Sequence, residues 1–294
     1  MSEPRAEDEA WTIGRLIRWT TDFLAARQVD SPRLEAEILL AHALGWPRMK
    51  LYMHINEEVG SLGRSSFREL VKKRAAGMPV AYVVGHKEFY SLDFQVNQQV
   101  LIPRSDTETL VMAFLELAKS SENPLCVDVG TGSGCITVTC LKHHATARFI
   151  AIDQSAVALE IARINAEKHQ MTSRVEFRHG DLIGPLQAHE NPLFILSNPP
   201  YIPSADILVL EPQVRDFEPH SALDGGTDGL SIIRRLVDQA SEKLAPGGYL
   251  LIEIGFDQAR AVSAEFASHP ALDFKGVRKD LAGHARVLVM QKAL

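Results

Sequence analysis

The N-terminal part of the chain carries apolar side chains at helical spacing. The stretch 11–27 predicts one helix, with apolar positions at Ile13, Leu16, Ile17, Phe23 and Leu24. Pro32 suits the first turn of a second helix, which we expect to end near Gly45. A third helix is predicted over 65–76. Together these segments predict a small helical domain, with a core of its own, over residues 1–77.

A different periodicity follows this bundle. Leu92, Phe94 and Val96 alternate with polar residues, which is the spacing of a strand with one buried face. Together with residues 88–90 this strand predicts a hairpin. Residues 78–104 lack the Gly/Ser-rich composition of a flexible linker, so we predict a structured β-hairpin connector there.

From residue 105 onward, apolar strands alternate with helices, and 105–294 is predicted to form the second domain. Ser105 and Glu108 have the spacing of a capping box at a helix start. The predicted strands are 125–129, 148–152, 175–177, 193–197, 249–254 and 285–290. The predicted helices are 136–143, 156–168, 230–244 and 258–267. This alternation is typical of an α/β domain whose mainly parallel sheet is covered on both faces.

Composition and charge narrow the class of protein. The chain has 294 residues, 46% hydrophobic and 23% charged, which excludes a disordered tail protein or a small disulfide scaffold. The net charge of −6 does not favour a protein that binds long nucleic acids by phosphate neutralisation. We find no apolar run of membrane-spanning length and expect no targeting segment in the acidic N-terminus.

The cysteines and histidines give no sign of a metal centre. Cys126, Cys135 and Cys140 form no C-x-x-C motif, so we expect buried thiols in a reducing, cytoplasmic compartment. The 11 histidines show no spacing typical of metal ligands. We therefore predict no metal site.

A glycine-rich loop follows the first strand of the α/β domain. Its residues are Gly130, Thr131, Gly132, Ser133 and Gly134, and Asp128 precedes it. Alternate glycines let the backbone turn sharply and let a ligand approach it. The spacing does not fit the dinucleotide fingerprint G-x-G-x-x-G. Instead, G-x-G-x-G with an acid two residues upstream resembles the S-adenosylmethionine (SAM) loop of Rossmann-like methyltransferases.

Two acids follow the next two strands. Asp153 can accept hydrogen bonds from ribose hydroxyls, although an aspartate that caps a helix would read the same way. Asp181 and Leu182 stand where such methyltransferases contact the adenine. A turn residue and a core residue are the respective alternatives.

The most specific motif is Asn198-Pro199-Pro200-Tyr201, directly after a strand. Proline fixes φ and has no N–H, so the loop is stiff. An Asn oxygen and a proline carbonyl can accept both hydrogens of a planar –NH2 group, and Tyr201 can stack on that plane. The motif resembles that of amino-methyltransferases acting on adenine, guanine or glutamine, and we predict that its four residues are catalytic and bind substrate, with Asn198 also near SAM.

Further segments extend the resemblance over about residues 80–294. They are 85–89, 100–104, 106–108, 215–219, 222–223, 225–226 and 228–230. These motifs resemble the HemK/PrmC family, the protein-(glutamine-N5) methyltransferases of peptide chain release factors. The chain departs from the family at Ser91, where glycine is common, at Ser105, where proline is usual, and at Leu182, which is often aromatic.

The resemblance implies a fold, a substrate and partners. It implies a seven-stranded sheet with one antiparallel strand near its edge, carried by a last hairpin that includes 285–290. It implies SAM as cofactor and the GGQ glutamine of a class I release factor as substrate, gripped in part by the N-terminal bundle. Arg104 is a candidate substrate-binding residue or an exposed loop arginine. We expect a cytoplasmic monomer without stable nucleic-acid or membrane binding.

Three other functions stay open from the sequence. One is methylation of a glutamine in a ribosomal protein, which would use the same core. Another is methylation of DNA or RNA amino groups, which would need a basic groove or a target-recognition insertion. The third is a non-catalytic adaptor, which the intact loop glycines, Asp153 and the N-P-P-Y motif argue against.

Overall fold

A computed structural model describes residues 10–294. The chain separates into two compact units, and the division falls after Gly85. Each unit has its own hydrophobic core and is described by itself below. The domain limits predicted from the sequence stay a prediction.

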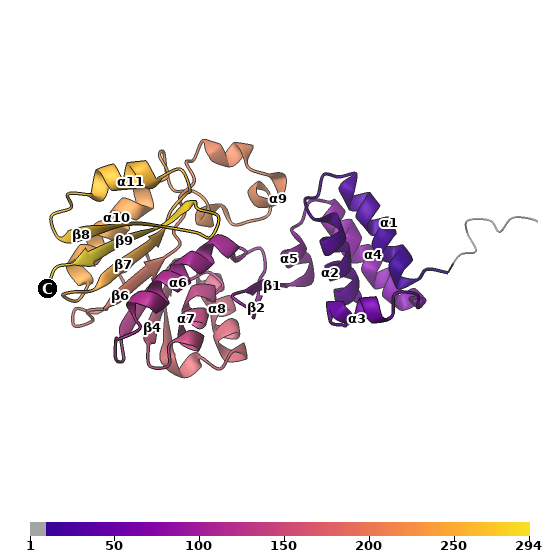
Figure 1. The fold of residues 1–294 in the computed structure, drawn as a ribbon, viewed down its shortest axis with the longest axis horizontal. Helices are drawn as coiled ribbons and strands as arrows, with labels where there is room; N and C mark the ends of the chain where they lie inside the picture. The colour runs from indigo at the N-terminus through magenta and orange to yellow at the C-terminus, as the bar shows by residue number, and fades with distance from the viewer. Residues whose placement is uncertain (1–9) are drawn as a thin grey trace, which may run out of the picture. The chain divides into compact units, whose positions relative to one another are not determined.

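The first unit is a bundle of helices (Figure 1). They are α1 (Ile13–Ala25), α2 (Pro32–Leu44), α3 (Arg48–Met53), α4 (Ser61–Ala75) and α5 (Val80–Val84). Pro32 is at the start of α2, and Gly45 ends it in the left-handed conformation, as the sequence indicated. Leu39, Leu40 and Leu51 are fully buried in the core that the helices share.

The second unit is built on a seven-stranded sheet of order β5-β4-β3-β6-β7-β9-β8. Its strands are β3 (Leu125–Val129), β4 (Arg148–Asp153), β5 (Val175–His179), β6 (Phe194–Ser197), β7 (Tyr249–Glu253), β8 (Leu272–Lys279) and β9 (Ala285–Lys292). The first five strands in this order pair in parallel, whereas β9 runs antiparallel to both β7 and β8. The predicted α/β class and the antiparallel strand near the edge are confirmed.

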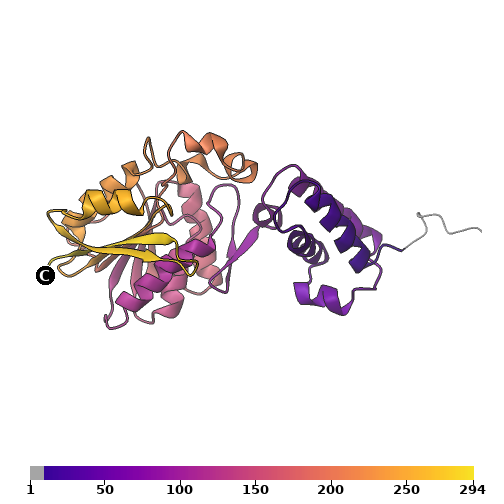
Figure 2. The ribbon, with the colours of Figure 1, turned by 45° about the horizontal axis from the view of Figure 1, so that its top comes forward.

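Helices cover both faces of this sheet (Figures 1 and 2). They are α6 (Glu108–Leu117), α7 (Cys135–His143), α8 (Ala156–Lys168), α10 (Ser231–Lys243) and α11 (Ala259–Phe266), whereas the short α9 (Pro212–Arg215) lies in the segment between β6 and α10. One core packs α10 and α11 against the strands, and the other packs α6 and α7 against the opposite face. Because parallel strands end at the same edge, the loops after β3, β4, β5 and β6 converge there.

A two-stranded hairpin precedes the sheet, formed by β1 (His86–Phe89) and β2 (Leu92–Gln95). Its turn residues Tyr90 and Ser91 both have positive φ, 51° and 59°. The capping-box interpretation of Ser105 and Glu108 is wrong. Glu108 instead accepts a hydrogen bond from the backbone N–H of Tyr90 at 3.0 Å, and residues 105–107 form a short 3-10 helix.

The three cysteines are free and buried, as predicted. Burial raises the pKa of the Cys135 thiol to about 12. Among the described residues, no helix is long and apolar enough to cross a membrane.

Candidate functional site

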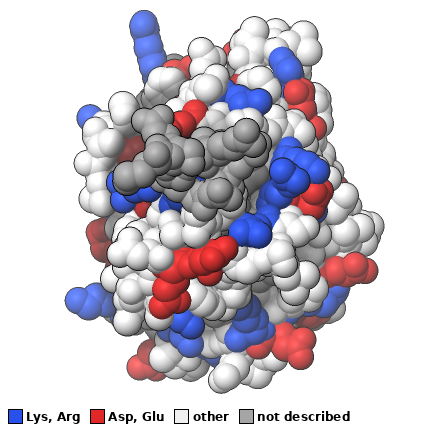
Figure 3. Space-filling view, turned by 90° about the vertical axis from the view of Figure 1, so that its right-hand side faces the viewer, with Lys and Arg blue, Asp and Glu red and all other residues white. Residues whose placement is uncertain are grey.

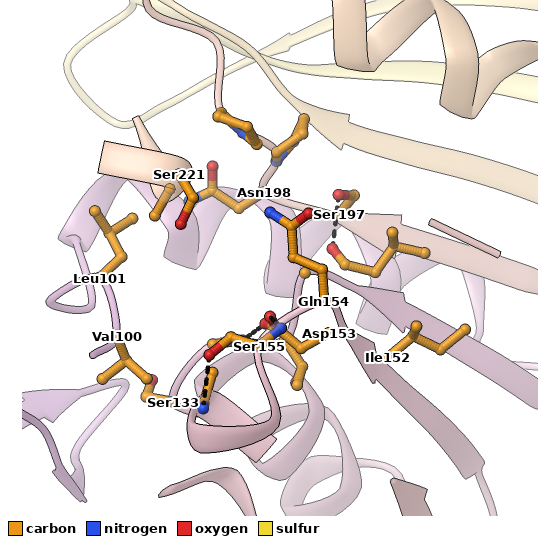
Figure 4. Close-up of a pocket in the computed structure, with 18 of the residues that line it drawn as sticks. Val100, Leu101, Ser133, Ile152, Asp153, Gln154, Ser155, Ser197, Asn198 and Ser221 are labelled. Atoms are coloured by element: carbon orange, nitrogen blue, oxygen red, sulfur yellow. Dashed lines mark hydrogen bonds between the residues drawn. The ribbon is translucent and has the colours of Figure 1, made fainter. Parts of the chain in front are cut away.

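A pocket lies where the parallel strands end. The loops after β3, β4, β5 and β6 form one part of its wall, and the segments 99–107 and 219–222 form another. In Figure 4, Val100 and Leu101 lie on one side of the pocket, Ser133 at its lower end, and Asn198 and Ser221 at its upper end. All of these elements belong to the second unit.

The glycine loop forms the lower end of the pocket. Gly130 and Gly132 have φ values of 72° and 53°, which glycine adopts without strain. A Cβ on Gly130 would meet no atom within 4 Å, and one on Gly132 only a backbone oxygen at 3.9 Å. The loop therefore leaves open space above its backbone that a ligand can occupy.

Asp128 holds this loop from behind. Its Oδ2 accepts hydrogen bonds from the hydroxyls of Thr131 and Thr137, both at 2.7 Å. Its Oδ1 is buried and has no hydrogen-bond partner among the described residues. Complete burial raises the pKa of Asp128 to about 6 despite the two hydroxyls.

Asp153 ends β4 beside the loop. Its Oδ2 accepts from the N–H of Gly132 at 2.8 Å, and its Oδ1 from the N–H of Ser155 at 2.9 Å. Burial raises its pKa. Each carboxylate oxygen keeps a second acceptor position, so a ligand diol could still be bound.

Asp181 and Leu182 follow β5 and also line the pocket. The carboxylate of Asp181 forms an ion pair with Arg235 on α10. Leu182 is buried and has a φ of 48°. This leucine is therefore held in a backbone conformation that few non-glycine residues adopt.

Asn198, Pro199 and Pro200 form the wall opposite the glycine loop. Ser197, the last residue of β6, donates its hydroxyl to the carbonyl of Val129 at 2.8 Å, which ties the two loops together. Asn198 donates from Nδ2 to Oγ1 of Thr107 at 3.1 Å. The side-chain oxygen Oδ1 of Asn198 therefore remains available to accept a hydrogen bond from a ligand.

Tyr201 is not one of the described residues that line the pocket. Its hydroxyl donates to Oε1 of Glu253, the last residue of β7, at 3.4 Å. Gln258 donates from Nε2 to the Tyr201 carbonyl at 2.8 Å. Gly229 has a φ of 74°, and a Cβ there would overlap the same carbonyl. The backbone after the prolines is thus packed tightly in place.

Arg104 lines the pocket and joins two of its walls. It donates to Oε1 of Glu218 at 2.5 Å and to the carbonyl of Ile102 at 3.2 Å. The Glu218 side chain is only 2% exposed, and burial raises its pKa even though Arg104 opposes the shift. This ion pair connects the segment before α6 to the segment after the N-P-P-Y loop.

Most of the predicted site residues therefore meet in one pocket. The ones that line it are Arg104, Gly130, Thr131, Gly132, Ser133, Asp153, Asp181, Leu182, Asn198, Pro199 and Pro200. Asp128, Gly134 and Tyr201 lie behind it, with Gly134 as the N-cap of α7. The sequence reasoning missed Thr107 and Glu253. Glu253 could have been recognised in the sequence, because it is an acid at the end of an otherwise apolar strand, as Asp153 is.

Each of the two units matches a known protein family. Residues 15–85 match the family described as PrmC N-terminal domain, and residues 106–209 match Methyltransferase small domain. A release factor glutamine methyltransferase of Rhodopirellula baltica is 41% identical over 98% of this chain and 99% of its own length. One of Geobacter sulfurreducens is 43% identical over 88% of this chain and 89% of its own length.

A solved structure supports the fold. A methyltransferase from Pyrococcus furiosus aligns with a TM-score of 0.53 at 17% identity, over 79% of this chain and 99% of its own. At that identity the likeness concerns the fold alone. From the full-length similarity to the curated relatives and the two family matches, this chain belongs to the release factor glutamine methyltransferase family.

Proposed function

We propose that this protein transfers the methyl group of SAM to the side-chain amide nitrogen of the glutamine in the GGQ motif of class I release factors, and so supports translation termination. The observation that carries the proposal is the position of Asn198 and Pro199. They line the same pocket as the glycine loop. The family relatives, which bear this activity in their names, support the assignment.

The residues present fit SAM. Gly130 and Gly132 leave room above the loop, and Asp153 has acceptor positions for ribose hydroxyls. Asp128 would support the loop from behind, and Asp181 and Leu182 would border the adenine. When bound there, SAM supplies an activated methyl group on its sulfonium.

The chain's own part in the reaction is orientation and hydrogen bonding. A glutamine amide nitrogen is a poor nucleophile because its lone pair is delocalised into the carbonyl. The Asn198 Oδ1 and the Pro199 carbonyl accept its two N–H groups, and this favours the positive charge that develops on nitrogen. One of the two protons then leaves to solvent, so that the product is a neutral secondary amide. The two prolines fix the loop, so little reorganisation is required. Tyr201 stays a candidate for packing against the substrate amide.

The N-terminal unit is proposed to grip the release factor. A groove between α1 and α4 is lined by Trp19, Phe23, Arg27 and Arg68. Trp19 stacks on Phe23 with ring centroids 5.0 Å apart, and it is 50% exposed. Aromatic and arginine side chains are the types that most often anchor protein partners.

Nucleic-acid methylation is less well supported than the glutamine reaction. The face of the first unit in Figure 3 carries basic and acidic side chains side by side. A strong phosphate-binding surface would instead carry a basic excess. We propose a cytoplasmic monomer that binds release factors and no nucleic acid stably.

The test is transfer of radiolabelled methyl from SAM to a purified bacterial release factor. We expect label on the wild-type release factor and none on a variant with its GGQ glutamine changed to alanine. Asn198→Ala should lower kcat by about a hundredfold, since an electrostatic contact to the reacting group is lost. The Kd of SAM, measured by calorimetry, should change much less. Label on neither release factor, with SAM still bound, would refute the substrate and direct attention to a ribosomal protein.

A further inference from the structure

Thr107 and Glu253 lie behind the reacting wall of the pocket. Thr107 is 2% exposed and Glu253 is 1% exposed. The Thr107 oxygen accepts Nδ2 of Asn198 at 3.1 Å, and the Thr107 hydroxyl lowers the pKa of the neighbouring Glu253 carboxyl. A chain of polar contacts thus runs from Glu253 at the end of β7, through Thr107 just before α6, to Asn198 in the N-P-P-Y loop.

The direction of this chain follows from donor chemistry. An ionised carboxylate can only accept, so Thr107 must give its single O–H to Glu253. The Thr107 oxygen is then left as an acceptor, and Asn198 must turn its –NH2 group toward it. The amide oxygen of Asn198 consequently takes the opposite side, where a substrate –NH2 would need an acceptor.

We propose that Glu253 and Thr107 are positioning residues, which fix the Asn198 amide with its oxygen toward the substrate. This inference rests on the proposed methyl transfer to an amide nitrogen. It gives a role to an acid that stands in a core, where its Oε2 has no hydrogen-bond partner among the described residues. A neutral acid or an amide in place of the Glu253 carboxylate could donate to Thr107. Thr107 could then donate its O–H to the Asn198 oxygen, which would turn that oxygen away from the pocket.

The charged groups around Glu253 determine when it ionises. Burial raises the pKa of Glu253 to about 7, with Thr107 and then Arg286 of β9 opposing the shift and Asp106 adding to it. Tyr201 faces it from the N-P-P-Y loop, and Cys135 from α7. Arg286 is itself shared with Asp106, Nη2 to Oδ2 at 2.7 Å. The ionised, productive form should therefore accumulate as the pH rises through about 7.

The first test compares threonine variants that differ in one hydroxyl. Thr107→Val should lower kcat about tenfold, the equivalent of one hydrogen bond of about 1.4 kcal/mol, with the Kd of SAM within about twofold. Thr107→Ser keeps the hydroxyl and should recover most of kcat. Thr139→Val is the matched control because Thr139 on α7 is buried with no hydrogen-bond partner for its hydroxyl among the described residues, so kcat should not change.

The second test follows kcat against pH from 5.5 to 9 on the intact release factor. In the wild type, kcat should rise through about pH 7. In Glu253→Gln, kcat should be lower and that rise should be absent. Equal kcat in Thr107→Val and Thr139→Val would overturn the inference, and so would an unchanged rise in Glu253→Gln or a parallel loss of SAM binding. If the wild type itself transfers no methyl group, the proposed function has failed and not this inference alone.

Discussion

The carboxylate of Asp128 should weaken the fold at neutral pH. It is fully buried at the end of β3, and its Oδ1 has no hydrogen-bond partner among the described residues. Asp128→Asn keeps the shape and an oxygen that can accept from Thr131 and Thr137, and it removes the charge. We expect this variant to be more stable than the wild type, by an amount that depends on pH.

The size and sign follow from the pKa. Burial raises the pKa of Asp128 from 3.8 to about 6 in the folded state. Because the folded form holds the proton more tightly, the group's stabilising contribution is fully present below pH 3.8 and is lost as the pH rises through 6. At 1.36 kcal/mol for each pKa unit, the loss is about 3 kcal/mol. The free energy of unfolding of Asp128→Asn should therefore gain about 2.5 kcal/mol on the wild type between pH 4 and pH 8, since a small part of the loss has already occurred at pH 4.

The assay is urea unfolding followed by circular dichroism at several pH values, with the two proteins compared at each. Asp22→Asn is the matched control, because Asp22 on α1 is exposed. The difference between its free energy of unfolding and that of the wild type should not change with pH. If the difference for Asp128→Asn is also independent of pH, the reasoning is refuted. Such a result would mean that ionising Asp128 in the folded protein does not reduce the free energy of unfolding.

Two further predictions concern the connector and the ion pair. Ser91→Gly should raise the free energy of unfolding by about 1 kcal/mol, seen as a higher Tm, because Ser91 occupies a turn position with a φ of 59°; an unchanged or lower Tm would contradict this. Arg104→Ala should cost about 2 kcal/mol in urea unfolding, because it leaves the buried Glu218 carboxylate without its partner. Adding Glu218→Gln should recover part of that loss, and a double variant no better than Arg104→Ala would count against the pair.

The sequence predicted the parts of the fold that depend on local periodicity. Six strands of the large sheet were recognised by their apolar runs. The edge strand β8 was not, since Gly276 and two register shifts interrupt its pattern and only Leu272 in it is buried. The capping box failed for a related reason. Ser105 and Glu108 have the right spacing, yet Glu108 bonds to Tyr90, which is distant in the sequence.

The site residues also separate into those that local sequence motifs predicted and those that depend on packing between distant segments. The glycine loop and Asn198 could be identified because each motif is contiguous and its backbone constraints are local. Tyr201 belongs to the same motif, but its hydroxyl is directed to Glu253 by the packing of β7 behind the loop, which no local pattern encodes. The support for Asn198 likewise comes from Thr107. A motif can thus name the group that contacts the substrate, whereas the direction in which its amide points is decided by buried partners from other strands and helices.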